Sequence, residues 1–308
     1  MKKIAIACFA LAVIAVLVMP VPVVAQQSYV DSASSGPPPV IQVFKEEVKP
    51  GKSPLHTKSE AGFVAAYKKA GLKYYYLATT SMSGKPEAWF MNAYASMEDV
   101  EKANEAFDAN KTVQAELDRI NVSDGDLLSN ASSMYLFYNP ELSYRPNFNL
   151  GEYKYFMVDT YRVKLGHYDK FAETRKVINA AHEKANLDEH MLVYNVGLGG
   201  AAGTVIVFQP VKSLKEYDDS AKTHGKGSEY YEALGDEGRK LMTAYNQNDA
   251  MYFQRDFQAI SPQMSFVSDK VMASNPSFWN QKTQMAKAPG KTAKPAAMKD
   301  VSKTEKQQ

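Results

Sequence analysis

Cysteine is nearly absent from this chain of 308 residues, which contains a single one, Cys8. It lies inside the apolar stretch Ile4–Met19, which we expect to be removed by cleavage. A mature chain without a thiol excludes disulfides, a cysteine nucleophile and thiolate metal sites. Lipid attachment at Cys8 would need a charged start and an apolar segment before it, and only seven residues precede it. We therefore do not expect a lipoprotein.

A long hydrophobic run is also lacking, because Ile4–Met19 is shorter than the roughly 20 residues that cross a bilayer as a helix. Two lysines precede this stretch, and the small residues Val23 and Ala25 follow it. This order predicts a signal peptide over residues 1–25, cut before Gln26, with an uncleaved anchor as the alternative. We expect a periplasmic or secreted protein with no transmembrane span after signal cleavage.

Aromatic residues are missing from residues 281–308, which hold seven lysines, two acids and two prolines. Such a composition cannot bury enough apolar surface to fold, so it predicts a disordered basic tail. The tail carries +5, and Lys2 and Lys3 would leave with the signal peptide, so the total of +2 leaves −5 for the remaining body. No nucleic-acid-binding motif accompanies the tail. The Ser- and Pro-rich residues 26–39 are expected to form a linker.

What the sequence does contain is an internal repeat. A shift of 115 residues sets Val48–Leu72 over Val163–Leu187, with eight of 25 positions identical. A shift of 117 residues then pairs Ser96-Met97 with Ser213-Leu214, Leu117 with Leu234, and Met134-Tyr135 with Met251-Tyr252. The shared order favours duplication over chance. We expect repeat 1 to span residues 40–146, repeat 2 to span 152–262, and a C-terminal extension to follow at 263–280.

Each repeat has the pattern strand, helix, strand, strand, helical segment, strand. In the second repeat an apolar stripe at helical spacing is formed by Tyr168, Phe171, Ile178, Ala181 and Ala185. Four glycines between 197 and 203 lead into a strand instead of a helix, which indicates a hairpin turn and not a phosphate-binding loop. The predicted fold class is α+β, with two tandem ferredoxin-like (βαββαβ) units whose antiparallel four-stranded sheets pack face to face.

The element order, the length of each unit and the Val-Lys-x-Gly step at Val48–Gly51 and Val163–Gly166 resemble the dimeric α+β barrel superfamily. Within it, the chain is most similar to the NIPSNAP and antibiotic-biosynthesis-monooxygenase group. The resemblance covers about Val40–Ile260. It implies that the two sheets close into a barrel and that ligand binds in the cavity between them. It also implies the alternative functions of a cofactor-independent monooxygenase or a haem-binding, haem-handling enzyme.

Strand alternation predicts which side chains face that cavity. Val43 and Val158 are assigned to the helix side, so their neighbours along the strand face the cavity. The predicted ligand-binding residues are Glu46, Tyr75, Asp159, Tyr161, His190, Tyr194, Tyr252 and Asp256. A histidine beside a carboxylate suits proton transfer, and the tyrosines suit an aromatic ligand. The alternative is that these groups are structural and satisfy one another at a sheet interface.

Other chemistry receives less support. Trp89 and Asn92 invite comparison with cofactor-independent oxygenases, but three residues apart in a strand they face opposite sides. His190 is the best candidate for a haem ligand. His182 adjoins the apolar stripe of its helix and is expected to pack there. The run of His182, Asp188, Glu189 and His190 has no established metal-ligand spacing, so we predict no metal site.

These observations predict an exported protein that binds a small apolar or aromatic molecule between its sheets, or acts as a scaffold, without a cofactor. An enzyme is the alternative function, with haem as the alternative cofactor. Self-association is compatible with the resemblance, and nucleic acid is not an expected partner.

Overall fold

The computed structural model describes residues 36–72 and 74–280, so the predicted signal peptide and basic tail lie outside the described residues. No helix in the described ranges is both long and apolar enough to cross a membrane. The first half contains β1 (Val40–Val48), α1 (Ser53–Lys69), β2 (Tyr76–Ser81), β3 (Glu87–Tyr94), α2 (Met97–Ala109), α3 (Lys111–Gly125) and β4 (Leu128–Tyr138). The second half contains β5 (Tyr155–Val163), α4 (Tyr168–Lys184), β6 (Leu192–Leu198), β7 (Thr204–Val211), α5 (Leu214–His224), α6 (Glu229–Asn248) and β8 (Ala250–Ile260). The 3-10 turn η2 (Leu150–Glu152) links the halves, and α7 (Asp269–Ser274) and α8 (Pro276–Trp279) follow β8.

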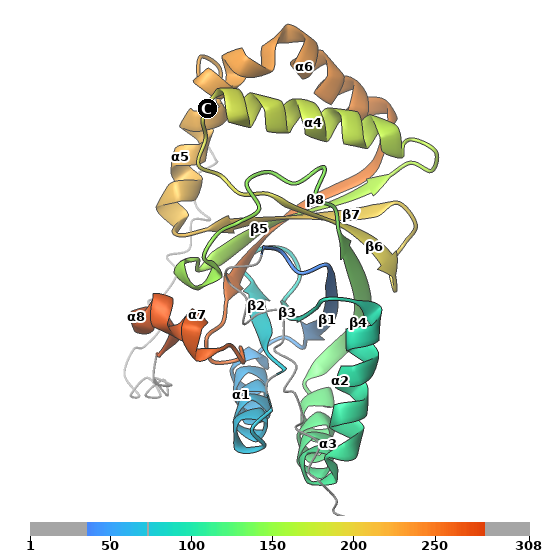
Figure 1. The fold of residues 1–308 in the computed structure, drawn as a ribbon, viewed down its shortest axis with the longest axis vertical. Coiled ribbons are helices and arrows are strands. Elements are labelled where there is room, and N and C mark those ends of the chain that lie inside the picture. Colours follow the sequence, from blue (N-terminus) through green and yellow to red (C-terminus); the bar gives the residue numbers. More distant parts are fainter. Residues whose placement is uncertain (1–35, 73, 281–308) are drawn as a thin grey trace, which may run out of the picture.

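The strands form one closed antiparallel barrel in the order β1-β3-β2-β8-β5-β7-β6-β4. The first half contributes the order β4-β1-β3-β2 and the second half β8-β5-β7-β6, so the two halves share one connectivity. Pairing of β2 with β8 and of β4 with β6 seals the ring. The barrel crosses the middle of the molecule, with α1–α3 at one end and α4–α6 at the other (Figure 1). The prediction of an α+β fold with antiparallel strands is confirmed.

The pairing register shows how the halves correspond. Val40 pairs with Tyr94 in the first half, and Tyr155 pairs with Val211 in the second. These pairs preserve the predicted shifts of 115 and 117 residues. Helices α1 and α4 are both 17 residues long and obey the first shift from end to end.

The last strands depart from the predicted alignment. Val48 lies opposite Leu128, and its counterpart Val163 lies opposite Ala250, which gives a shift of 122 residues. The sequence pairing of Met134-Tyr135 with Met251-Tyr252 is therefore wrong by five residues. The cause is the helical region before the last strand, which is longer in the second half than in the first.

The barrel interior holds one apolar cluster drawn from both halves. Its strand residues are Ile41, Val43, Leu77, Trp89, Met91, Leu136, Phe156, Val158, Leu192, Tyr194, Ile206, Phe208 and Ile260. Trp89 and Phe208 meet edge to face across the two halves at 6.5 Å. The assignment of Val43 and Val158 to the helix side was thus wrong. Both point into the barrel, and Glu46, Asp159 and Tyr161 face the helices instead.

The inversion has a physical reason. A closed barrel of side chains offers a polar group neither water nor a helix to pair with, so its interior selects the apolar set of each strand. The outer face lies against helices, whose polar side chains can reach it. Phe171 of α4 and Tyr245 of α6 also pack there on the apolar outer residues Val193 and Val205.

The C-terminal extension packs against the barrel. Val267, Val271 and Trp279 join the interior cluster, and the indole Nε1 of Trp279 donates a 2.9 Å hydrogen bond to the carbonyl of Gly151. Gly151 has no room for a side chain, because a Cβ would lie 2.6 Å from the carbonyl oxygen of Val271. The segment predicted as a C-terminal extension therefore packs as part of the folded body.

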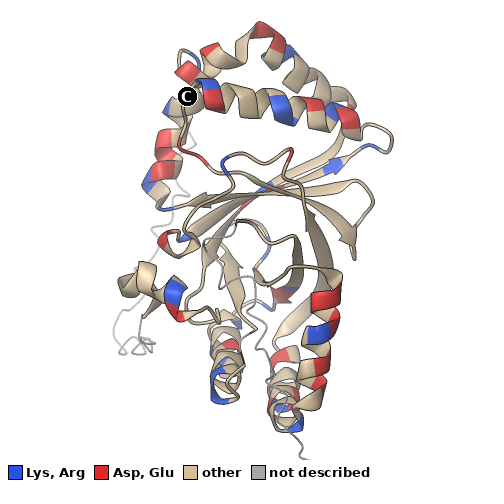
Figure 2. Cartoon of the chain, in the orientation of Figure 1, with Lys and Arg blue, Asp and Glu red and all other residues tan. Residues whose placement is uncertain are grey.

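Charged residues lie mainly on the helices, and the barrel strands carry few (Figure 2). Three strand charges, Glu46, Asp159 and Arg255, face the helical layers, whereas Lys45 and Glu87 pair with each other beside Trp89 on the interior side. Because burying a charge requires a partner, these positions indicate where the molecule holds specialised groups.

Candidate functional site

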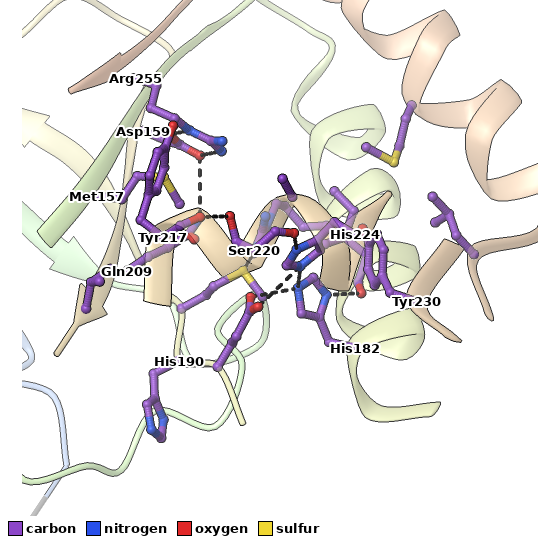
Figure 3. A pocket seen from close by; sticks show the side chains of 18 of the residues that line it. Met157, Asp159, His182, His190, Gln209, Tyr217, Ser220, His224, Tyr230 and Arg255 are labelled. Carbon is purple, nitrogen blue, oxygen red and sulfur yellow. Dashed lines mark hydrogen bonds and ion pairs between the residues drawn. The ribbon is translucent and has the colours of Figure 1, made fainter. Parts of the chain in front are cut away.

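A cavity of about 680 Å³ lies on the outer face of the second-half sheet, beneath α4, α5 and α6. Its walls combine strand residues such as Met157, Asp159 and Gln209 with helix residues such as His182 and His224 (Figure 3). Tyrosines 161, 217, 230 and 231 add an aromatic lining. The cavity is thus formed between sheet and helices, and not between the two sheets.

Three side chains at this cavity converge on one point. They are His182 near the end of α4, Glu189 in the segment before β6, and His224 at the end of α5. The Nε2 atoms of the two histidines lie 3.4 Å apart. Each Nε2 also lies 3.4 Å from a different oxygen of the Glu189 carboxylate. We refer to these three residues as the His-Glu-His triad.

The backbone fixes the tautomers of both histidines. His182 Nδ1 lies 2.7 Å from the carbonyl oxygen of Ile178, and His224 Nδ1 lies 2.9 Å from that of Ser220. A carbonyl only accepts, so each Nδ1 must carry the hydrogen and donate it. The lone pairs of both neutral rings are then on Nε2 and point at the triad. Two lone pairs at 3.4 Å repel each other unless a proton or a cation lies between them.

Ring packing holds this arrangement in place. Tyr230 contacts both imidazoles edge to face, with ring centroids 4.6 Å from His182 and 4.7 Å from His224 (Figure 3). Tyr144 packs on His182 from another direction at 5.4 Å. Orientation of the rings by backbone hydrogen bonds and packing is typical of histidines that ligate metals.

The electrostatics favour an ionised Glu189. Burial alone would raise its pKa, but the hydrogen bonds and charges of His182 and His224 outweigh burial and lower the pKa to about 2. For His224, burial acts to lower the pKa, and the Glu189 carboxylate reverses this and raises it. The site therefore presents one full negative charge to whatever cation the two rings share, be it a proton or a metal ion.

The triad has the dimensions of a metal site. Four ligands at tetrahedral corners with bonds of 2.0–2.1 Å place their donor atoms about 3.3–3.4 Å apart. The two Nε2 atoms lie at this separation, 3.4 Å, and so fit two corners of such a tetrahedron. The Glu189 carboxylate lies beside the third corner, with Oε2 3.4 Å from His182 and Oε1 3.4 Å from His224. Two histidines and one glutamate with an open fourth position form a donor set of catalytic zinc sites.

A buried arginine lies in the same cavity wall. Arg175 is only 4% exposed, and its terminal nitrogen Nη2 donates to Asn179 Oδ1 and contacts Met191 Sδ at 3.1 Å. Its Nε has no hydrogen-bond partner, and no carboxylate of the described residues forms an ion pair with it. Burial lowers the pKa of the guanidinium, which nevertheless stays charged at neutral pH. The wall therefore contains a cation without a counter-ion.

Asp159 does not supply that counter-ion, because it is committed to Arg255. Arg255 donates from Nε to Oδ1 at 2.6 Å and from Nη2 to Oδ2 at 2.7 Å, which forms a bidentate ion pair (Figure 3). The pair lies on the strand side of the cavity and neutralises itself.

The structure separates the residues predicted to bind ligand. Asp159, Tyr161 and His190 line the described cavity, with His190 Nδ1 2.5 Å from the carbonyl oxygen of Arg145. Tyr194 lies in the barrel interior, on the opposite face of the sheet. The expected single cavity between the sheets, shared by Asp159, Tyr161 and Tyr194, is therefore wrong.

The remaining predicted residues lie elsewhere. Glu46 contacts His56 in the first half, and the ring of Tyr75 packs on Phe266. Tyr252 and Asp256 lie on the exposed stretch of β8, where Tyr252 donates to Gln254 and Gln254 donates to Asp256.

The sequence analysis missed the triad because of His224. His182 and Glu189 are seven residues apart and were weighed together, but His224 is 35 residues further on and meets them only because α4 and α5 both pack on α6. The available signal was local. His182 and Arg175 are seven residues apart on α4, two turns, and so share one helix face.

No known protein family and no curated protein matches the sequence. Solved structures with similar folds include a presumed monooxygenase from Fusobacterium nucleatum, at 13% identity and a TM-score of 0.47, covering 73% of this chain and 93% of that one. A chlorite dismutase variant from Candidatus Nitrospira defluvii has 11% identity and a TM-score of 0.41, covering 77% and 95%. A haem-binding protein from Thermus thermophilus has 12% identity and a TM-score of 0.40, covering 73% and 91%. Likeness at this level does not assign an activity.

The triad does not fit a haem. A haem iron shared by two histidines requires them on opposite faces of the porphyrin ring. Here the Glu189 carboxylate contacts both Nε2 atoms at 3.4 Å while they lie 3.4 Å from each other. No space for a porphyrin plane remains between the three groups.

Proposed function

We propose that this protein binds a Zn²⁺-type transition-metal ion through His182, Glu189 and His224 and uses the ion's fourth position to hold a small anionic molecule in the cavity. The observation that carries the proposal is the convergence of two Nε2 atoms that lie 3.4 Å apart on one carboxylate, with a different oxygen of Glu189 3.4 Å from each ring. Both imidazoles have their Nδ1 hydrogens occupied by backbone carbonyls, which leaves Nε2 free to ligate.

Charge argues for an anionic ligand. Two neutral imidazoles and one carboxylate leave a bound divalent ion with an excess of one positive charge. Arg175 adds an unpaired guanidinium in the same cavity wall. Its position two helical turns from His182 corresponds to a rise of about 10 Å, which a small molecule spans. The tyrosine-rich lining favours an aromatic body, so an aromatic carboxylate is the ligand class we propose.

In such a site the metal ion would act as a Lewis acid toward a bound oxygen atom. The chain's own residues supply the rest: Arg175 fixes the anionic end of the ligand, and Tyr230 keeps both imidazoles aimed at the same point. Binding is the minimum function of this arrangement, and turnover would require a ligand that places its reactive oxygen at the fourth position.

Cobalt substitution tests the metal centre. The full-length protein, stripped with a chelator and titrated with Co²⁺, should develop the intense visible bands of tetrahedral cobalt. The His224→Ala variant should lose them. His167→Ala is the matched control. His167 precedes α4, is more exposed than His224 and pairs with Asp249 outside the triad. Tetrahedral bands that persist in His224→Ala, or are absent from the folded wild-type protein, would contradict the proposal.

We further propose that this site belongs to an exported protein. The supporting features are the charged start, the apolar stretch and the small residues before Gln26, with residues 1–25 as signal peptide. A periplasmic or secreted location is tested by fractionating cells and determining the mature N-terminus by mass spectrometry. A full-length cytoplasmic protein would refute it.

The shared strand order of the halves supports a description as two tandem ferredoxin-like units, over residues 40–146 and 152–262. Within the dimeric α+β barrel superfamily, a NIPSNAP or antibiotic-biosynthesis-monooxygenase relationship rests on the sequence pattern alone. The haem alternative is tested by adding haem to the purified protein, where a Soret shift that is lost in His190→Ala would revive it.

A further inference from the structure

A second cluster of ionisable side chains lies at the opposite end of the molecule, under α1 and α3 (Figure 1). It consists of Glu46 on β1, His56 and Glu60 one turn apart on α1, and Asp124 at the end of α3. His56 is 2% exposed, Glu60 5% and Asp124 3%. Their ligand atoms all lie within 4.8 Å of one another. We refer to these four residues as the carboxylate cluster.

The cluster is short of hydrogen bonds and of positive charge. His56 Nε2 lies 2.8 Å from Glu46 Oε2, but 3.8 Å from Asp124 and 4.0 Å from Glu60, both too far for hydrogen bonds. Asp124 Oδ1 is fully buried without a hydrogen-bond partner. The hydroxyl of Ser59 is near enough to favour the ionised carboxylate, but it is not placed to hydrogen-bond with it. No lysine or arginine within residues 36–72 or 74–280 forms an ion pair with Glu60 or Asp124.

Two buried carboxylates and the partly buried Glu46 around one imidazole are costly to ionise together. Burial is the main cause that raises the pKa of Glu60 to about 9, followed by the charges of Glu46 and Asp124. Burial also raises the pKa of Asp124. The cluster must therefore either retain protons or be neutralised by a cation that lies among its oxygens.

We propose that Glu46, His56, Glu60 and Asp124 bind a divalent cation of the Mn²⁺ type. Six-coordinate ions with bonds of 2.1–2.4 Å place neighbouring donors about 3.0–3.4 Å apart and opposite donors about 4.2–4.8 Å apart. The ligand atoms of the cluster all lie within 4.8 Å of one another, so shifts of a few tenths of an ångström in the side chains would place them around one ion. Carboxylate oxygens suit Mg²⁺, Ca²⁺ and Mn²⁺, and the single imidazole favours Mn²⁺ among these. The ion would also give Asp124 Oδ1 the partner that it lacks.

The second half shows that the fold does not require this cluster. The shift of 115 residues places Tyr161, Phe171 and Arg175 where the first half has Glu46, His56 and Glu60. An acid and an arginine thus occupy equivalent inward positions on helices of equal length. The four converging ligand atoms are a property of the first half alone, as expected for a site and not for a scaffold.

Manganese binding tests the inference independently of the triad. The free Mn²⁺ signal in electron paramagnetic resonance should fall as full-length protein is added, both in wild type and in His224→Ala. Glu60→Gln should weaken Mn²⁺ binding by about tenfold or more, since it removes a direct ligand charge. Glu116→Gln, an exposed acid on α3 paired with Arg119, is the control and should bind as wild type does.

Glu60→Gln should fold, because it replaces a buried carboxylate by a neutral group of the same shape. Its melting temperature in chelator should equal or exceed that of the wild-type protein. Asp124→Asn provides a second variant with the same expectation for Mn²⁺. Unchanged Mn²⁺ affinity in both variants, or a folded wild-type protein without saturable Mn²⁺ binding, would overturn the inference and leave protons as the occupants of the cluster.

Discussion

The two halves of the barrel share one backbone plan but place opposite chemistry beneath their helices. Glu60 and Arg175 occupy equivalent positions on α1 and α4, and each is buried against the outer face of its own sheet. Glu60 lies among further acidic side chains, whereas Arg175 lies in a cavity with the His-Glu-His triad. The interior of the barrel, by contrast, is mainly apolar in both halves, and its buried polar side chains Thr79 and Gln258 hydrogen-bond to each other. Duplicated backbones can therefore diverge most freely at the sheet-to-helix interface, where polar side chains find partners.

The largest expected difference between the halves is in how their charged clusters make the free energy of unfolding depend on pH. In chelator, the folded protein keeps the Glu60 proton up to about pH 9, whereas the unfolded chain releases it near its ordinary pKa of 4.5. Because the folded state then binds more protons, the free energy of unfolding should fall as pH rises between these values, by up to about 1.4 kcal/mol per unit. The contribution is fully present below the unfolded pKa.

Urea denaturation from about pH 5 to about pH 8 measures this slope, and Glu60→Gln should reduce it. Glu46, His56 and Asp124 are present in both proteins, and the tyrosines that face Glu60, Tyr67 and Tyr76, have pKa values raised beyond this range. Equal slopes in the two proteins would show that Glu60 is ionised at neutral pH.

Equivalent substitutions in the barrel interior should reduce the free energy of unfolding by similar amounts in the two halves. Val43→Asp and Val158→Asp each bury a charge in the shared apolar cluster, so each should cost about 3 kcal/mol or more in the free energy of unfolding. Since β2–β8 and β4–β6 pairing joins the halves, circular dichroism and tyrosine fluorescence should report one transition for both variants. Two separate unfolding transitions would show that the two halves of the barrel unfold independently.

Removing the guanidinium charge of Arg175 in the second half should affect ligand binding and not folding. Arg175→Met keeps the bulk of the side chain and removes a buried charge that lacks an ion pair. We expect an unchanged or higher melting temperature and an affinity for benzoate about tenfold lower, equivalent to about 1.4 kcal/mol. Calorimetric titration of the zinc-loaded protein measures this, and Lys176→Met, on the same helix but paired with Glu141, is the control. If Arg175→Met leaves the affinity for benzoate unchanged, the proposal that Arg175 binds an anionic ligand is contradicted.

The smallest expected effect is the same in both halves. Ser96 and Ser213 cap α2 and α5 by accepting hydrogen bonds from the backbone N–H of Asp99 at 3.1 Å and Glu216 at 3.3 Å. Ser96→Ala and Ser213→Ala should each lower the free energy of unfolding by about 1 kcal/mol. A cost that differs strongly between the two caps would mean that the helices after β3 and β7 do not contribute equally to the stability of the barrel.

Local features of the sequence predicted the order of elements well. Helix α4 lies where the apolar stripe was found, and the glycines between 197 and 203 form the predicted turn between the paired strands β6 and β7. Ser96 and Ser213 were aligned by the shift of 117 residues and prove to be equivalent caps. These features depend on neighbours in the chain, so the sequence contains them directly.

Long-range features were not predictable in this way. Strand alternation separates Val158 from Asp159 and Tyr161, but only closure of the barrel decides which set points inward. The triad requires His224, brought to His182 by the packing of α4 and α5 on α6. The carboxylate cluster likewise joins α1 to the far end of α3, and Asp124 lies 64 residues after Glu60. Such contacts arise from tertiary packing, which no local pattern encodes.

The closed ring of strands also determines how two copies of this chain could meet. An open sheet offers a row of unpaired N–H and C=O groups at each edge, and a second molecule can extend it by one more strand. Here each of the eight described strands has a hydrogen-bonded neighbour on both sides, but β8 pairs with β2 only over residues 258–260 and β4 pairs with β6 only over residues 135–138. Residues 128–134 of β4 and 250–256 of β8 therefore have a strand partner on one side only, and strand addition between two copies is confined to these two exposed stretches.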